Sequence, residues 1–182
     1  MVGGHRLVVS ATQVEAAHVP PGTDLLVTGI GKVAAASAVA ARLAGSPGRY
    51  SEVVDIGSAG ALRDGLSGLY VPSRVLNHDI SAAALERMGY ATEDTLALEG
   101  GDGTVLATGD LFVADPAVRS RLALRVHLVD MEGFAVAWAC RRAGVACRLV
   151  KHVSDDADTS SMQWPELVER SAVALGEWLA AN

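Results

Sequence analysis

Apolar residues recur along this chain with two different spacings, which predict strands that alternate with helices. Short apolar runs typical of strands lie at residues 6–10, 24–28, 53–56, 69–76, 105–108, 126–129 and 148–153. Longer segments with helical spacing lie at residues 32–44, 81–88, 116–124, 132–143 and 165–179. Strands that alternate with helices in this way predict an α/β sandwich with a largely parallel sheet.

Turn-forming residues set the boundaries of several elements. Asp115 followed by Pro116 is typical of a helix start. Pro72 lacks a backbone N–H, so it predicts an edge position or a bulge in the fourth strand-like run. The acidic, Gly-rich segment 90–102 is predicted to be a loop. No repeat, low-complexity tract or linker divides the chain, and we expect residues 1–182 to form one domain.

Composition and charge narrow the possible partners. A net charge of -6 argues against nucleic acid and anionic membranes, because both select clustered Lys and Arg. The apolar run at residues 7–9 is too short for a targeting signal, and the Ala-rich run at 33–41 is shorter than a membrane span. Cys140 and Cys147 have no metal-ligand spacing and indicate thiols in a reducing compartment. We expect a cytoplasmic protein with no metal and no organic cofactor.

Two acidic residues stand where strand-like runs end. Glu132 follows the apolar Met131 and begins a helix-like run, and Asp155 comes directly after a strand-like run. In α/β folds, ligands bind at the rim that is formed by the ends of the strands. This placement therefore predicts a binding site rather than a solvated surface.

The turn GIGKVA at residues 29–34 allows several interpretations. It matches a loose G-x-G-x-x-A pattern, and Asp55 follows about twenty residues later, as in a dinucleotide-binding unit. It is not a P-loop, because Leu26 occupies the place of the first Gly and no Ser or Thr follows Lys32. We rank a turn whose backbone contacts an anion first, a purely structural turn second and a nicotinamide site third.

Five separated motifs resemble, in their order and spacing, the nucleoside phosphorylase/nucleosidase superfamily. The resemblance is greatest to the 5′-methylthioadenosine/S-adenosylhomocysteine nucleosidases. The motifs are TGIGKVAA at 28–35, IGSAGAL at 56–62, TGDLFV at 108–113, VDMEG at 129–133 and SDDAD at 154–158. The resemblance implies a three-layer α/β/α sandwich with a mixed, largely parallel central sheet. It also implies hydrolysis of the N-glycosidic bond of a purine nucleoside through a ribosyl cation-like transition state.

The same resemblance implies three catalytic carboxylates. Glu132 matches the Glu that holds the ribose hydroxyls, where a carboxylate stabilises positive charge developing on the sugar. Asp155 matches the Asp that protonates purine N7, which requires a proton that burial would favour. Glu15 falls where the family places the Glu that activates water, a role that contributes on the order of 10²–10⁴ in rate.

Substrate-binding residues also follow from the resemblance. Phe112 is expected to stack on the purine, while the backbone of Val113 reads the edge of the base. Met131 is expected to lie under the ribose, and Ser58 to position water or ribose. Ser154, next to the predicted acid, completes this set.

Each assignment has a structural alternative. Glu15 could be an acid in a first helical turn, worth about 0.3–1 kcal/mol through the helix dipole. Glu132 could cap its helix, Phe112 could be a core residue, and Asp155 could be a solvated loop acid or part of a magnesium site. We expect the histidines of the region to be structural rather than metal ligands.

The chain departs from the family pattern in ways that affect the expected pocket and the expected dimer. The chain is short: about a dozen residues join Glu15 to Thr28, and the segment 89–104 is trimmed. Lys151 stands where relatives usually carry Arg, so the planar, fork-shaped guanidinium group is absent here. We expect a reshaped pocket for the 5′ substituent and, from family precedent, a homodimer.

Three other functions stay open. A futalosine-type nucleosidase shares the same carboxylate layout. A purine nucleoside phosphorylase is less favoured, because no Arg lies between Arg6 and Arg42 and the carboxylate of Glu15 would repel phosphate. A non-catalytic nucleoside-binding protein is the third, and the presence of all three acids argues against it.

Overall fold

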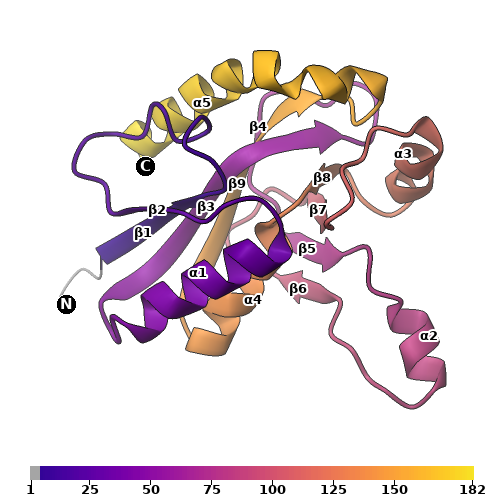
Figure 1. Cartoon of the computed structure of the whole chain (residues 1–182), viewed down its shortest axis with the longest axis horizontal. Coiled ribbons are helices and arrows are strands. Elements are labelled where there is room, and N and C mark those ends of the chain that lie inside the picture. The colour runs from indigo at the N-terminus through magenta and orange to yellow at the C-terminus, as the bar shows by residue number, and fades with distance from the viewer. Residues whose placement is uncertain (1–4) are drawn as a thin grey trace.

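The fold is one mixed sheet with helices on both faces, in a computed structural model that describes residues 5–182 except the side chains at 160 and 165. The strands are β1 (His5–Ser10), β2 (Leu25–Val27), β3 (Tyr50–Ala61), β4 (Leu69–Tyr70), β5 (Arg74–Asn77), β6 (Thr95–Ala97), β7 (Val105–Thr108), β8 (Leu128–Asp130) and β9 (Ala146–Asp155). The helices are α1 (Lys32–Ala44), α2 (Ala82–Arg87), α3 (Pro116–Ala123), α4 (Gly133–Ala143) and α5 (Trp164–Ala181), with a short 3-10 helix, η1 (Thr159–Gln163), before α5. Figure 1 shows α5 over one face of the sheet and α1 with α4 over the other. The three-layer prediction is confirmed.

Strand β3 is the centre of the sheet because it pairs with three other strands. It pairs in parallel with β1 and β9, and antiparallel with β8. Parallel pairs also join β1 with β2, β5 with β7, and β7 with β8, whereas β5–β6 and β4–β9 are antiparallel. The sheet is therefore mixed and largely parallel, as predicted. Because parallel strands end at the same edge, residues that follow β1, β3 and β9 lie close together.

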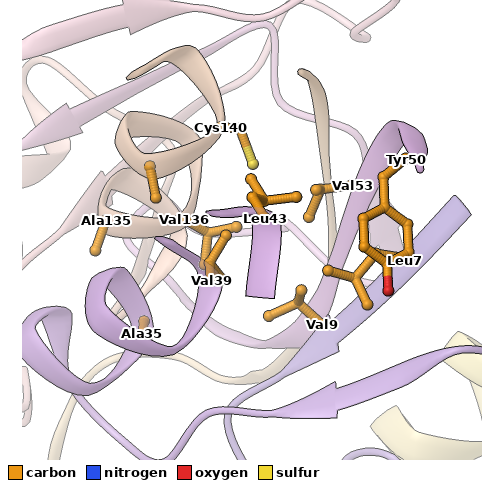
Figure 2. Close-up of a cluster of buried hydrophobic side chains, with 11 residues drawn as sticks. Leu7, Val9, Ala35, Val39, Leu43, Tyr50, Val53, Ala135, Val136 and Cys140 are labelled. Atoms are coloured by element: carbon orange, nitrogen blue, oxygen red, sulfur yellow. The ribbon is translucent and has the colours of Figure 1, made fainter. Parts of the chain in front are cut away.

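Apolar side chains join the three layers. In Figure 2, Val39 of α1 and Val136 of α4 lie in one buried cluster with Val53 of β3. On the opposite face, Leu175 of α5 is buried against Val150 of β9. Burying a Val or Leu side chain contributes about 1.5–3 kcal/mol, so these clusters hold the helices against the sheet.

Helix α5 has one buried face and one exposed face. Val168 and Leu175 are buried, while Glu177 is exposed. Gly176 allows close contact with the segment after β1, because a Cβ there would lie 2.4 Å from the backbone oxygen of His18. Within the described range, no helix combines the length and the apolar content that crossing a membrane requires.

The predicted end of the central strand was wrong. The apolar run predicts a strand that ends at Ile56, but β3 continues to Ala61. Its glycines permit close approach instead of forming a turn. A Cβ on Gly57 would lie 3.2 Å from Lys151 Nζ, and one on Gly60 would lie 2.9 Å from the Cβ of Ala157. Glycine is needed here because side chains that belong to the site occupy the space.

Two further predictions, for residues 69–76 and 90–102, need correction. The run 69–76 forms two strands, because the chain leaves its partner β9 around Pro72 and then pairs with β6 and β7. The segment 90–102 was predicted to be a loop, yet it contains the edge strand β6. Three residues are too few for an alternating pattern to be recognised.

Candidate active site

One pocket collects all eight side chains that the sequence analysis named. It lies where β1, β3, β8 and β9 end, beside the loop that follows β7. The predicted carboxylates Glu15, Glu132 and Asp155 all line it. The lining residues are Ala11, Thr12, Glu15, Ile30, Ser58, Ala59, Gly60, Leu111, Phe112, Val113, Val129, Asp130, Met131, Glu132, Ser154, Asp155 and Trp164.

Glu15 lies in a turn after β1, and its side chain is 5% exposed. Its Oε1 accepts hydrogen bonds from the backbone N–H and from the hydroxyl of Ser58, each at 2.8 Å. Its Oε2 accepts a hydrogen bond from Thr12 Oγ1 at 2.9 Å. Three donors therefore hold this carboxylate in one orientation. Thr12 Oγ1 also accepts a hydrogen bond from the N–H of Glu15 at 3.2 Å, so Glu15 lies in a helix-like turn while its side chain lines the pocket.

Glu132 precedes α4 but does not cap it. Asp130 Oδ2 accepts the hydrogen bond from the N–H of Gly133 at 2.9 Å, which leaves Glu132 free to accept one from the N–H of Gly31 at 2.7 Å. Burial, followed by repulsion from Asp130, raises the pKa of Glu132 to about 8, although the Gly31 N–H and Lys151 oppose the rise. Glu132 therefore binds its proton unusually tightly.

A buried ion cluster lies behind the pocket. The side chain of Lys151 is 2% exposed, and its Nζ lies 2.7 Å from Asp55 Oδ2 and 3.0 Å from Asp130 Oδ2. Burial acts to lower the pKa of Lys151, but the two carboxylates outweigh it and raise that pKa. Burial also raises the pKa of Asp55 to about 6, against the attraction of Lys151. The cluster joins β3, β8 and β9, the strands that precede or carry Ser58, Glu132 and Asp155.

Asp155 is held in a tight turn at the end of β9. Its Oδ2 accepts a hydrogen bond from the Ser154 hydroxyl at 2.6 Å, and its Oδ1 accepts one from the N–H of Ala157 at 2.9 Å. Ala157 has a φ of 50°, a left-handed conformation that is strained for a residue with a side chain. The missing side chain of Gly60 leaves room for this turn. Asp155 is therefore a partly buried residue that lines the pocket, whereas its neighbour Asp156 is exposed and does not line it.

The remaining lining is mostly apolar. Phe112 is 44% exposed, Leu111 54% and Ile30 59%, and all three line the pocket. The alternative that Phe112 is a core residue is therefore wrong. Met131 and the buried Val113 complete this side, so the pocket joins an apolar wall to a row of acids.

Sequence reasoning missed three contributors to the site. Thr12 orients Glu15, Asp130 caps α4, and Trp164 donates a hydrogen bond from Nε1 to Ser58 Oγ at 2.8 Å. Asp130 sits in the VDMEG motif, so its position offered a signal. Trp164 offered none, because only packing of α5 brings it to the pocket.

The glycine turn contacts carboxyl groups that belong to the protein itself. The N–H of Gly31 donates to Glu132, and the N–H of Lys32 donates to Asp110 Oδ1 at 2.8 Å. Gly31 has a φ of 94°, which side chains rarely allow. The nicotinamide interpretation is wrong, because Asp55 is 1% exposed and paired with Lys151, so it is not accessible to a ribose.

The histidines are not arranged for metal binding. His152 Nδ1 lies 2.9 Å from Ser171 Oγ, as expected for a structural His. His78 Nε2 is buried against Gly109 and has no hydrogen-bond partner within residues 5–182. Over that range, no group of His, Cys, Asp and Glu is arranged to hold a metal ion.

Comparison with protein families and individual sequences identifies relatives. The family model described as the phosphorylase superfamily matches residues 24–177. A 5′-methylthioadenosine/S-adenosylhomocysteine nucleosidase of Shewanella oneidensis is 31% identical in an alignment that is 172 positions long, and the match covers 77% of this chain and 70% of the relative. An aminodeoxyfutalosine nucleosidase of Helicobacter pylori is 27% identical, and its match covers 70% of this chain and 66% of the relative. The chain thus spans about two thirds of the length of such relatives.

Solved structures share the fold over nearly the whole chain. A futalosine hydrolase of Helicobacter pylori has a TM-score of 0.84 at 21% identity and covers 97% of this chain and 96% of its own. A 5′-methylthioadenosine/S-adenosylhomocysteine nucleosidase of Colwellia psychrerythraea, in complex with adenine, has a TM-score of 0.82 at 23% identity. The match covers 97% of this chain and 93% of that protein.

Removing the buried cation should destabilise the protein strongly. Lys151→Met leaves Asp55 and Asp130 buried without their partner, and we expect a loss of about 3–5 kcal/mol in the free energy of unfolding. Arg148→Met is the matched control, because Arg148 lies on the same strand and pairs with Glu52 in a partly exposed position. The control should lose about 0–1 kcal/mol. Urea unfolding of both variants measures the difference, and equal losses would contradict the role of the cluster.

The raised pKa of Glu132 predicts a pH dependence of stability. The folded protein binds this proton up to about pH 8, whereas an unfolded Glu releases it near pH 4.5, so stability falls as pH rises between these values. From about pH 6 to about pH 8 we expect a fall of about 1 kcal/mol per pH unit. Glu132→Gln should flatten this slope and the exposed control Glu177→Gln should not. Urea unfolding at several pH values measures it, and an unchanged slope in Glu132→Gln would count against the tightly bound proton.

Proposed function

The chain belongs to the phosphorylase superfamily, and we propose that it is a nucleosidase, which hydrolyses the N-glycosidic bond of a purine nucleoside. The products are the free base and a ribose derivative. Its relatives include proteins named for this kind of substrate, a methylthioadenosine and an aminodeoxyfutalosine nucleosidase. No metal and no organic cofactor takes part in the proposed reaction.

One observation supports this proposal most directly: the charged side chains that line the pocket in the described part of the chain are all acidic. Loss of the base leaves positive charge on the sugar, and preorganised carboxylates stabilise such charge. A phosphate nucleophile would instead be repelled by the carboxylate of Glu15, which acts as the base. The acidic lining therefore favours water over phosphate, and a hydrolase over a phosphorylase.

Each carboxylate has a separate role in the proposed reaction. Glu15 takes a proton from water as the water oxygen bonds to the anomeric carbon of the ribose. The electrons of the broken C–N bond pass to the base, whose N7 takes the proton carried by Asp155. The proton gained by Glu15 returns to solvent, and Asp155 is reprotonated, so the charges balance.

Glu132 would hold the ribose and respond to its binding. Ribose hydroxyls that donate hydrogen bonds favour the ionised form of a carboxyl group, as does positive charge on the sugar. Both would lower the raised pKa of Glu132. Glu132 would thus release its proton to solvent when the ribose binds and take one up again from solvent when the product leaves. The carboxylate formed in this way stabilises the positive charge that develops on the sugar.

The base and the sugar would lie between the apolar wall and the serines. Phe112 stacks on the purine, and the backbone of Val113 reads the edge of the base. Met131 lies under the ribose, Ser58 positions water or ribose, and Ser154 orients the acid through its hydrogen bond. A methylthioadenosine-like substrate is the first choice and a futalosine-like one the alternative, because relatives named for each kind of substrate are similar to this chain.

We further infer that residues 1–182 act as one domain and that two copies form a homodimer. A second copy would cover the exposed apolar side chains beside the pocket, among them Ile30, Val33 and Leu111. The cytoplasm is the inferred location, because Cys140 and Cys147 are neighbouring thiols that a reducing compartment preserves.

Base release decides the reaction type. The purified protein should release free base from methylthioadenosine, S-adenosylhomocysteine or aminodeoxyfutalosine at the same rate with and without phosphate. Chromatography of the products measures the base and the sugar derivative. Strict dependence on phosphate would establish a phosphorylase instead, and binding without release would indicate a non-catalytic protein.

The leaving-group role of Asp155 predicts a specific defect. Asp155→Asn cannot donate the carboxyl proton, so kcat should fall by at least about 10²-fold. Nucleoside binding, measured by calorimetry, should persist because the shape of the side chain is kept. Asp156→Asn is the matched control, since Asp156 is the exposed neighbour, and its kcat should stay unchanged. Near-normal turnover of Asp155→Asn would refute this role.

A further inference from the structure

We propose that Trp164 is a positioning residue that holds the carboxylate of Glu15 through the hydroxyl of Ser58. The inference rests on the proposed function in one respect, that Glu15 is the base that activates water. It concerns a residue that neither the motifs nor the sequence spacing singled out. Trp164 is the first residue of α5, and it lines the pocket together with Ser58 and Glu15.

The geometry forms a continuous chain of hydrogen bonds. Trp164 Nε1 donates to Ser58 Oγ at 2.8 Å, and Ser58 Oγ donates to Glu15 Oε1 at 2.8 Å. An indole N–H is only a donor, and a carboxylate is only an acceptor. The direction of the chain is therefore determined, because the hydroxyl receives from the indole and must give its single proton to the carboxylate.

This direction matters for the orientation of Glu15. Without the indole, the Ser58 hydroxyl could rotate and donate to another acceptor, because a hydroxyl rotor adapts to its partners. With the indole bonded, Oε1 receives both the hydroxyl and the backbone N–H of Ser58. Thr12 holds Oε2 from the other side. The base is thus prevented from turning away from the water that it activates.

The same contact links α5 to the chemistry. α5 begins directly after η1 and packs along β9 and β3, which carry Asp155 and Ser58. The side chain of Trp164 reaches from this helix across to β3. Trp178, near the other end of α5, packs instead in the apolar cluster between α5 and the sheet, so it serves as an internal control.

A double-mutant cycle tests the proposal on the whole chain. Trp164→Phe keeps an aromatic ring and removes the N–H, so kcat should fall about 3- to 10-fold, the effect of one net hydrogen bond, with KM little changed. In a Ser58→Ala background the same substitution should change kcat by less than about 2-fold, because the intermediate link is already absent. Trp178→Phe should leave kcat unchanged. Equal losses in both backgrounds, or a change confined to KM, would overturn the proposal and leave Trp164 as a wall of the pocket.

A second measurement tests the hydrogen-bond chain from Trp164 to Glu15 without an activity assay. In a ¹H–¹⁵N spectrum, the indole signal of Trp164, assigned by its loss in Trp164→Phe, should shift in Glu15→Gln when Ser58 is present. It should not respond to Glu15→Gln in the Ser58→Ala background, and the Trp178 signal should stay in place. An indole signal that ignores both substitutions overturns the proposal. Failure of the wild-type protein to release base from any nucleoside would instead refute the proposed function, and the spectra would still decide whether Trp164 holds Glu15.

Discussion

The buried contact of Lys151 with Asp55 and Asp130 is the constraint on which the rest of the site depends. Lys151 Nζ, on β9, lies 2.7 Å from Asp55 Oδ2 on β3 and 3.0 Å from Asp130 Oδ2 on β8. The contact therefore joins these three strands behind the pocket. Charges buried this deeply are tolerated only when they are paired, because removing them from water costs several kcal/mol per ion. The three strands must therefore keep their mutual register, and the side chains that follow them stay together in the pocket.

The hydrogen bonds around this cluster determine how the carboxyl group of Glu132 is oriented. Asp130 bonds Lys151, Thr108 and the first N–H of α4. Glu132 is thereby released from capping and turns to the N–H of Gly31. Burial without a full set of partners then raises its pKa to about 8. Asp130 thus belongs to the buried ion cluster and also influences the pKa of Glu132 in the pocket.

Much of the fold could be predicted from local patterns. The helix at 32–44 and the strand at 105–108 have the predicted bounds, because regular spacing and clear ends define them. The end of β3 was misjudged because glycine normally marks a turn, while here its lack of a side chain admits neighbours from other elements. The edge strand β6 was missed for its shortness.

Local patterns along the chain are enough to predict the alternation of strands and helices, the family motifs and the carboxylates that stand at strand ends. What those carboxylates contact depends on how the elements pack. The bond between Gly31 and Glu132 spans 101 positions, and the bond between Trp164 and Ser58 spans 106. Such pairs leave no local signal, because the distance between them depends on how the helices pack on the sheet. Periodicity records which face of an element is buried, and it says nothing about which polar group will lie opposite.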